Sequence, residues 1–304
     1  MSRRRILLVI GCLLMTSPVL ARDLIVDNLR GSDSQNDRGF VPGPATFGPY
    51  RTINRALAGA RSGDRIVLTN TGEPYREMIA LNGYRHSGSP GAPFEIVGNG
   101  ATLDGTVAAG MERWRAVGGG VWQLEPTPPG YPLLSRGGRP LNRVEIIAGG
   151  DLQQLQPLSW ARAGALIYFR GEPHRGPFDY PLEVTELTTG ITLYDVHDVV
   201  IRDLVVRGYR LDGINAHDRV RETAIVGVAS RHNGRSGITV AGASQVTIGA
   251  TLCEQNGKAQ LRVEGRGVAR LGNVDLVAGT DPAPFSAPAL VTEDAGQALE
   301  LPRQ

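Results

Sequence analysis

Residues 190–279 decide the fold, because the chain repeats itself there: GITLYDVHDVVIRDLVVRGYRLD, GINAHDRVRETAIVGVASRHNGRS, GITVAGASQVTIGATLCEQNGKA and a weaker copy, QLRVEGRGVARLGNVDLVAG. The period is 23 residues, with one copy of 24. β-Branched residues occupy alternate positions and helical periodicity is absent, which predicts several short strands in each copy. Repeats of this length bury their apolar side chains by stacking on one another.

The register of the strands can be read from residues one period apart. One inward column contains Ile191, Ile214, Ile238 and Leu261, and the next contains Leu193, Ala216, Val240 and Val263. Residues two apart on a strand share a face, so both columns point to one interior. Similar columns begin at Val199 and Leu204. The sequence therefore predicts an all-β fold, a parallel β-helix with three strands per turn.

This repeat resembles the right-handed parallel β-helix proteins of the pectin-lyase-like superfamily. Asn233 in RHNG and Asn256 in EQNG are similar to the stacked asparagine turn of that superfamily. The stretches GDRIVL, PYREMIAL, APFEIVG and ATLDG are similar to the N-terminal part of secreted β-helix polysaccharide lyases. The resemblance implies a right-handed coil and a role on extracellular polysaccharide.

The first 21 residues are typical of a secretory signal peptide. Three arginines precede the apolar run 6–14, and Val19-Leu20-Ala21 is a small-residue cleavage site. Lipoprotein processing at Cys12 is the alternative. No later segment has the ~20 consecutive apolar residues of a membrane span. We therefore expect an exported protein, secreted or periplasmic after cleavage near Ala21.

Export changes the interpretation of the charge. The chain has 32 basic and 30 acidic residues, and the predicted signal removes three arginines, which leaves 29 against 30. A nearly neutral mature chain argues against nucleic acid as a partner. Of the two cysteines, Cys12 leaves with the signal and Cys253 falls in an inward column. We expect a monomer without an intrachain disulfide, stabilised by its stacked core.

Four regions follow the signal in the predicted organisation. Residues 22–105 form the first turns, with a helix between Pro49 and Gly63 that covers the end of the coil. Residues 106–188 lose the repeat and contain all three tryptophans, which predicts an inserted antiparallel subdomain of hairpins. Its aromatic rings form either a sugar platform or the core of the insertion. Residues 189–279 are the regular turns, and residues 280–304 are a final turn or a tail.

Outward positions of the regular turns carry the candidate site residues. Aligning the copies places Tyr194 beside His217 and Glu264, and Asp195 beside Asp218. Three roles are open for these two aspartates. They bind a hard cation such as Ca²⁺, they take part in acid–base catalysis with His217, or they only cap turns. Thr192, Asn215, Thr239 and Arg262 form the adjacent outward column.

A third candidate catalytic residue comes from a local resemblance. Asp212 lies in RLDGIN, which resembles the NTDGID segment of β-helix polygalacturonases, where the first aspartate is catalytic. Asn215 replaces the second aspartate, and the GHG and RIK motifs are absent, which argues against polygalacturonase activity itself. The candidate catalytic residues are therefore Asp212, His217 and Asp218, and the candidate metal ligands are Asp195 and Asp218.

Substrate binding is predicted for outward arginines and their neighbours. Arginine binds acidic sugars through paired hydrogen bonds to a carboxylate. The candidate binding residues are Arg207, Arg231, Tyr194, Arg262 and Glu264. The sequence thus predicts a protein that acts on polysaccharide as a lyase or glycoside hydrolase, with Ca²⁺ as the candidate cofactor. The alternative is a non-catalytic β-helix that binds glycan without cleaving it.

Overall fold

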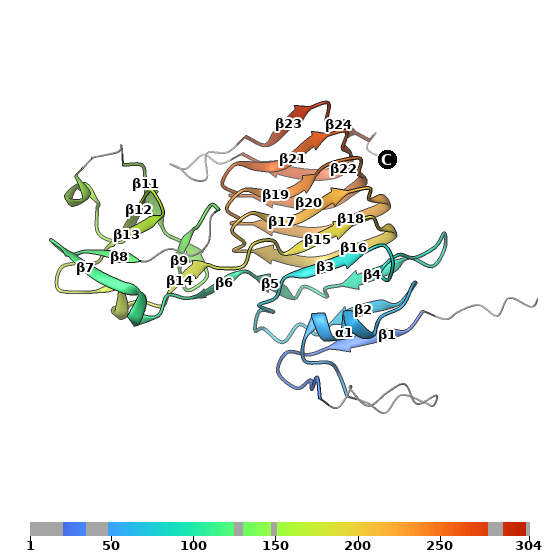
Figure 1. Cartoon of the computed structure of the whole chain (residues 1–304), viewed down its shortest axis with the longest axis horizontal. Helices are drawn as coiled ribbons and strands as arrows, with labels where there is room; N and C mark the ends of the chain where they lie inside the picture. Colours follow the sequence, from blue (N-terminus) through green and yellow to red (C-terminus); the bar gives the residue numbers. More distant parts are fainter. Residues whose placement is uncertain (1–20, 35–47, 125–129, 147–150, 279–287, 302–304) are drawn as a thin grey trace, which may run out of the picture.

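The structure, a computed structural model, describes residues 21–34, 48–124, 130–146, 151–278 and 288–301. It consists of a coil of parallel strands and, at one side of the coil, an insertion that includes β6 (Thr106–Ala108), β14 (Leu182–Thr185) and the strands between them (Figure 1). The predicted signal peptide lies outside the described residues, except for Ala21. No helix among the described residues is long and apolar enough to cross a membrane.

One parallel sheet, the long sheet, runs along the whole coil. Its described strands pair in the order β1 (Asp23–Val26), β2 (Arg65–Leu68), β4 (Phe94–Val97), β16 (His197–Arg207), β18 (Arg221–Arg231), β20 (Gln245–Glu254), β22 (Val268–Val277) and β24 (Gln297–Glu300), and β5 (Thr102–Asp104) also pairs with β16. The last turn includes β24, so the described part of the region after residue 280 continues the coil.

The second parallel sheet, the short sheet, forms another side of the coil. Its described strands pair in the order β3 (Ile79–Asn82), β15 (Ile191–Tyr194), β17 (Asp212–Asp218), β19 (Ser236–Val240), β21 (Ala259–Gly265) and β23 (Leu290–Asp294). Figure 1 shows these strands stacked in that order. Strands β3 and β15 are neighbours in space although residues 83–190 separate them in the chain.

The predicted inward columns are confirmed. Ile191 pairs with Ile214, Ile214 with Ile238, and Ile238 with Leu261. All four are fully buried in one apolar core that extends from Val26 to Leu271. The chain is therefore all-β with long parallel sheets, as in a parallel β-helix.

Three separate strands per turn are not confirmed. Strand β16 runs from His197 to Arg207 without a break, and so joins the segments predicted as second and third strands. Near its middle Asp203 has a φ of 56°, and the equivalent residues Gly227, Ala250 and Asn273 also have positive φ. The ladder skips Asp203 and resumes at Leu204. A local left-handed residue thus bends the strand at the place where the sequence suggested two strands.

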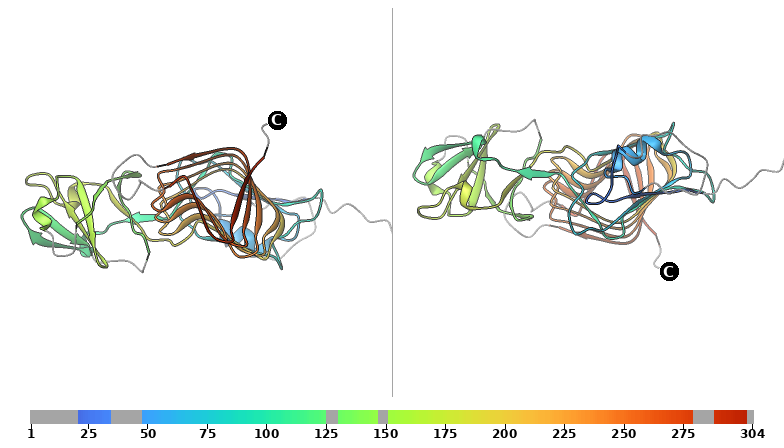
Figure 2. Two further views of the ribbon diagram at one scale, coloured as in Figure 1. Left: turned by 90° about the horizontal axis from the view of Figure 1, so that it is seen from above. Right: turned by 90° about the horizontal axis from the view of Figure 1, so that it is seen from below.

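The helix α1 (Ile53–Gly59) is shorter than the sequence predicted. Thr52 is its N-cap and accepts a hydrogen bond from the Arg55 amide, which starts the helix three residues after Tyr50. Tyr50 instead forms a parallel bridge with Val26. Ile53, Ala56 and Leu57 pack in the coil core. Figure 2 shows the helix at one end of the coil, beside β1 and β2.

The insertion is built mainly from antiparallel pairs. One of its described sheets has the order β10 (Arg139–Pro140), β9 (Leu134–Arg136), β14 (Leu182–Thr185) and β6 (Thr106–Ala108); the other has the order β11 (Asn142–Val144), β12 (Ser159–Ala163), β13 (Leu166–Arg170), β8 (Val121–Leu124) and β7 (Trp114–Gly118). Short 3-10 helices lie at Met111–Arg113, Leu152–Gln154 and Pro177–Asp179. The expected hairpins around Gly118–Gly120 and Gly164 are β7–β8 and β12–β13.

Four of the eight Trp, Tyr and Phe rings of the insertion are buried in its own core. Trp114, Trp160, Phe169 and Tyr180 are buried in a cluster separate from the coil core. Phe178 is 45% exposed and meets the partly buried Trp122 edge to face, with 5.0 Å between ring centroids. Of the two roles predicted for these rings, a sugar platform or the core of the insertion, the four buried rings have the second.

Two asparagines stack inside the turns that precede the short-sheet strands. Both Asn233 and Asn256 are fully buried, and the Asn233 side chain donates to Asn256 Oδ1 at 3.0 Å. The row continues to the Tyr209 amide on one side and to Gln260 Oε1 on the other. Cys253 lies in the same interior, where burial raises the pKa of its thiol to about 12. The hydrogen-bonded row fixes successive turns in register.

Candidate functional site

The outer face of the short sheet carries most of the candidate site residues. Thr192, Asn215, Thr239 and Arg262 pair in register, as predicted. Because alternate residues of a strand face opposite sides, these four point outward while Ile214, Ile238 and Leu261 point into the core. We refer to this surface as the outer face.

A bulge changes the second outward column. The pairing of β15 with β17 shifts by one residue after Leu193, so that Tyr194 pairs with Asp218. The 24-residue copy causes the shift, because His217 is the additional residue between Ala216 and Asp218. The predicted pairing of Tyr194 with His217, and of Asp195 with Asp218, is therefore wrong in register. A bulge of this kind redirects a side chain at the end of a strand.

Tyr194, His217 and Arg219 form a ring-and-cation cluster at this bulge. The Tyr194 and His217 ring centroids are 6.1 Å apart. The Arg219 guanidinium lies 5.3 Å from the Tyr194 ring centroid, and its Nη2 donates to the Tyr194 hydroxyl at 3.2 Å. Tyr194 remains 43% exposed. The sequence placed Tyr194 and His217 at the site, and the structure adds Arg219 to them.

The two candidate metal ligands are engaged by other groups of the protein. Arg219 Nε donates to Asp195 at 3.1 Å, and the Ala243 amide donates to Asp218 at 2.9 Å. The described residues contain no group of three or more His, Cys, Asp or Glu side chains suited to a metal ion. These two carboxylates are thus a poor fit to the oxygen shell of Ca²⁺, which uses six to eight ligands.

Asp218 also lacks the properties of a general acid. The hydrogen bond from the Ala243 amide lowers the pKa of the Asp218 carboxyl below its ordinary value. A general acid that works near neutral pH needs a raised pKa. His217, next to Asp218 on β17, is exposed.

Asp212 lies at the opposite end of β17 from His217. Strands rise about 3.3 Å per residue, so the Asp212 and Asp218 backbones are roughly 20 Å apart. The Asp212 carboxylate is fully buried and accepts two hydrogen bonds from Arg235, from Nε at 2.9 Å and from Nη2. This ion pair raises the pKa of Arg235. Asp212 is therefore too far from His217 and Asp218 to act on the same substrate bond. Its carboxylate instead holds the Arg235 side chain in place.

Arg262 and Glu264 belong to a small ion-pair network on the outer face. Arg262 Nε donates to Glu264 at 2.8 Å, and its Nη2 donates to Glu293. Glu264 and Glu293 pair in register on β21 and β23. Two carboxylates thus share one guanidinium.

Arg207 and Arg231 lie elsewhere, at the end of the long-sheet strands. They pair in register, and Arg231 Nη1 is 3.6 Å from Glu254. Arg207 Nε donates to the buried Asp104 at 2.9 Å. Neither arginine shares a sheet with Tyr194 or Arg262.

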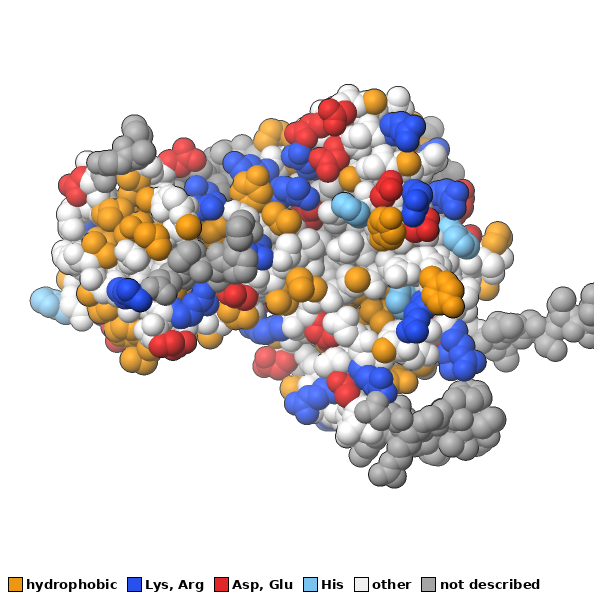
Figure 3. Space-filling model, viewed as in Figure 1, with side chains coloured by type: hydrophobic (Ala, Val, Ile, Leu, Met, Phe, Trp, Pro, Cys, Tyr) orange, Lys and Arg blue, Asp and Glu red, His pale blue; other side chains and the backbone are white. Residues whose placement is uncertain are grey.

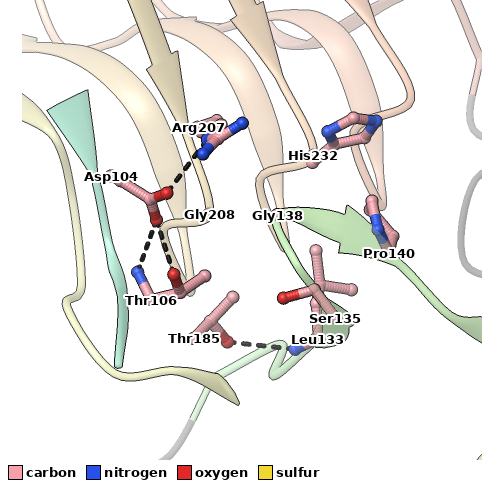
Figure 4. Close-up of a pocket in the computed structure, with 10 residues that line it drawn as sticks. All are labelled: Asp104, Thr106, Leu133, Ser135, Gly138, Pro140, Thr185, Arg207, Gly208 and His232. Atoms are coloured by element: carbon pink, nitrogen blue, oxygen red, sulfur yellow. Dashed lines mark hydrogen bonds and ion pairs between the residues drawn. The ribbon is translucent and has the colours of Figure 1, made fainter. Parts of the chain in front are cut away.

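Arg207 lines a pocket at the junction of the coil and the insertion (Figure 4). Coil residues Asp104, Gly208 and His232 face Leu133, Ser135 and Pro140 of the insertion across it. The cavity volume is ≈ 20 Å³, which accommodates about one water molecule. Burial lowers the pKa of His232, so its neutral form is favoured here. A cavity of this volume is too small for a sugar.

Several residues of these sites carried no clear sequence signal. Arg219, Arg235 and Glu293 are charged residues in or next to turns, and the sequence gives no partner for them. The 24-residue copy was the available signal for Arg219, because an extra residue in a repeat indicates a bulge. Figure 3 shows basic and acidic side chains interspersed on the visible face of the coil.

Comparisons with known proteins give a fold. No family model matches the chain, and no curated protein matches it. Among solved structures, the chain is similar to XylC in complex with xylose, with a TM-score of 0.65, 11% identity and coverage of 91% of this chain and 57% of that chain. It is also similar to a structure described as a glycoside hydrolase, with a TM-score of 0.55, 12% identity and coverage of 84% of this chain and 73% of that chain.

These two likenesses concern the backbone. The chain spans 57% of the length of the XylC chain, and both identities are far below the level at which activities are shared. Together with the parallel sheets, they establish a β-helix fold and leave the activity of this chain open to proposal.

Proposed function

We propose that this protein binds a polysaccharide along the outer face of the short sheet. The observation that carries the proposal is the cluster of Tyr194, His217 and Arg219, in which an exposed ring lies beside an imidazole and a guanidinium. An exposed aromatic side chain offers an apolar face and a polar tip, and sugars have both kinds of surface. XylC, whose structure contains xylose, has a similar fold, and this supports the same ligand class.

The proposal also covers the handedness of the coil, the role of α1, export and the oligomeric state. We infer a right-handed coil of the pectin-lyase-like type, with α1 as the cap that shields the edge of the long sheet. We also infer export after cleavage near Ala21 and action as a monomer. A Ca²⁺ ion at Asp195 and Asp218 would compete with protein donors, because both carboxylates accept hydrogen bonds from the chain.

Glycoside hydrolysis is the second candidate function, and Glu264 with Glu293 favours it. Most glycosidases act through two carboxyl groups that flank the scissile bond. Glu264 and Glu293 are neighbours on adjacent strands, and Arg262 holds both. A lyase instead needs a metal or a free cation to neutralise the uronate carboxylate. The outer-face arginines Arg219, Arg235 and Arg262 are already paired with carboxylates, so hydrolysis is better supported than elimination.

The test is a binding and cleavage screen against neutral and acidic polysaccharides, with calcium and with a chelator. Binding is measured by affinity electrophoresis, elimination by the absorbance of unsaturated products, and hydrolysis by new reducing ends. We expect Tyr194→Ala to weaken binding about tenfold, which corresponds to ~1.4 kcal/mol. Phe178→Ala is the matched control, because Phe178 is equally exposed but lies in the insertion.

The outcomes separate the candidates. Binding without products supports a binding protein, and new reducing ends that Glu264→Gln and Glu293→Gln abolish support a hydrolase. Unsaturated products that require calcium support the lyase that the sequence left open. If no polysaccharide binds, the proposed function is wrong.

A further inference from the structure

Tyr84 is the most exposed large hydrophobic side chain among the described residues. It is 93% exposed and lies in the turn that follows β3. A single exposed ring is ordinary on a protein surface, but several at one place mark a binding surface. Tyr84 lies at the corner where the short sheet ends, and the exposed rings of Tyr194 and His217 lie at the same corner.

The turn that carries Tyr84 packs directly against the next turn of the coil. Asn82 pairs in register with Tyr194, and the Gly83 amide donates to the Tyr194 carbonyl at 3.1 Å. A Cβ atom at Gly83 would overlap the Asp195 carbonyl oxygen, so glycine is required for this close approach. The backbone before Tyr84 is therefore fixed against the residues at the end of β15.

Three exposed rings thus follow one another on three consecutive turns. Tyr84 follows β3, Tyr194 ends β15 and His217 lies near the end of β17, and these strands are neighbours in the short sheet. Because neighbouring strands are about 4.8 Å apart, the rings follow the coil axis. The next turn has Ala241 and Gly242 at this corner, so the row ends there. We refer to Tyr84, Tyr194 and His217 as the ring row.

Hydrogen bonds hold the turn of Tyr84 in one conformation. The Tyr84 amide donates to Asn82 Oδ1 at 3.2 Å, and the amides of Arg85 and His86 both donate to the Asn82 carbonyl at 3.0 Å. The buried His86 ring joins this turn to the Leu57 carbonyl of α1. A binding residue on a preformed turn requires little ordering when the ligand binds. Tyrosine also offers a large contact area with few rotatable bonds.

We propose that the ring row binds an extended chain of pyranose sugars that lies along the coil axis, and that Tyr84 is a binding residue of this site. This inference rests on the proposed function, and it adds the direction of the ligand and a further contact. A pyranose unit has an apolar face of C–H groups that packs on an aromatic ring, while its hydroxyl groups stay in water. A chain along the axis contacts both tyrosines, whereas a chain that follows one strand contacts only one.

Tyr84→Ala separates a ligand contact from a structural role. Because the side chain is almost fully exposed, its truncation should leave the melting temperature unchanged. It should weaken the binding of a hexasaccharide about fivefold, the scale of one aromatic contact. Tyr84→Phe keeps the ring and should retain wild-type affinity, because the face of the ring makes the contact. Met111→Ala is the matched control, since Met111 is 67% exposed but lies in the insertion.

The experiment measures wild-type, Tyr84→Ala, Tyr84→Phe, Tyr194→Ala and Met111→Ala proteins by isothermal titration calorimetry. The ligands are xylo-, cello- and galacturono-oligosaccharides of two and of six units. The inference predicts that a hexasaccharide binds more tightly than its disaccharide, and that both tyrosine-to-alanine variants lose affinity for it. The Tyr84→Phe and Met111→Ala proteins should bind it like the wild type.

A loss of affinity in only one of the two tyrosine-to-alanine variants overturns the inference, because the ligand then contacts a single turn. A comparable loss in Tyr84→Phe or Met111→Ala also overturns it, and so does equal affinity for the disaccharide and the hexasaccharide. These results leave the proposed function in place, since the protein still binds sugar. If none of the hexasaccharides binds the wild-type protein, the proposed function fails as well, so the two failures are distinguishable.

Discussion

The coil and the insertion bury their apolar residues in different ways. In the coil, each turn adds one layer of aliphatic side chains, and residues one repeat apart pair in parallel register from Ile191 to Leu261. In the insertion, aromatic rings from several hairpins meet in a compact cluster around Trp160 and Phe169. The coil is thus stabilised by many similar contacts between aliphatic side chains, and the insertion by contacts among a few large aromatic side chains.

This difference predicts how each region responds to damage. Loss of one layer of a repeat weakens its two interfaces with neighbouring turns and leaves the rest of the array. Loss of one large ring from a small core removes a considerable share of its buried area. The four predictions below test this contrast, beginning with the largest effect.

Trp160→Ala should destabilise the insertion strongly. Trp160 is 1% exposed, and its indole donates to the Leu141 carbonyl at 3.0 Å. Truncation of a buried tryptophan costs about 4 kcal/mol. Differential scanning calorimetry should show a separate, earlier transition for the insertion, with the coil transition retained. Trp122→Ala, at a partly exposed ring, should lose less than half as much. A single, unchanged transition would show that the insertion has no stability of its own to lose.

Asn256→Ala should have the largest effect within the coil. The Asn256 side chain donates to Ser230 and Gln260, and its Oδ1 accepts from Asn233. Because all these groups are buried, the substitution leaves several unpaired, at a cost of roughly 3 kcal/mol. Urea unfolding measures the change. The control is Asn142→Ala on the exposed surface of β11, which should change stability by less than ~0.5 kcal/mol. Equal effects of the two variants would contradict a stabilising asparagine row.

Asp104→Asn should loosen the junction between the two regions. Asp104 is buried and accepts from Thr106 of β6 and from Arg207 of β16. Neutralising it removes a charge-assisted bond, at a cost of about 2 kcal/mol. Limited proteolysis should then cleave near β6 and β14 more quickly. Asp23→Asn breaks the exposed pair of Asp23 with Arg65 and should cost less than ~1 kcal/mol. No change in proteolysis would show that Asp104 does not hold the junction.

The smallest effect concerns pH and His86. His86 Nδ1 accepts from the Asn82 amide and Nε2 donates to the Leu57 carbonyl, an arrangement that requires neutral imidazole. Burial lowers the pKa of His86 in the folded protein below its ordinary value of 6.5. The unfolded chain therefore binds a proton first as pH falls. The stability contribution is complete above the unfolded pKa and is lost as pH falls from there through the folded pKa.

The measurement is the melting temperature between about pH 8 and pH 5, the range in which histidine titrates. Across this range the free energy of unfolding of the wild-type protein should fall by on the order of 1 kcal/mol more than that of His86→Gln. His174→Gln, at an exposed loop position, is the control and should follow the wild-type curve. Identical curves for all three proteins would show that His86 does not titrate with unfolding.

Some parts of the site were predictable and others were not. The outward row of Thr192, Asn215, Thr239 and Arg262 follows from the repeat and is confirmed. The grouping of Asp212 with Asp218 as catalytic residues did not hold, because a strand length separates them and Arg235 binds Asp212. Nothing in the linear sequence pairs Arg235 with Asp212, or Arg262 with Glu293 across residues 279–287.

The sequence by itself determined the stacking of the coil, because a fixed period with alternating apolar residues has one way to bury them: each residue over its equivalent in the next turn. It also determined the antiparallel hairpins of the insertion through their glycine turns. Only the tertiary structure decided which arginine pairs with which carboxylate and where the bulge places His217. Those outcomes depend on side chains from different turns meeting in space, and local periodicity carries no information about such meetings.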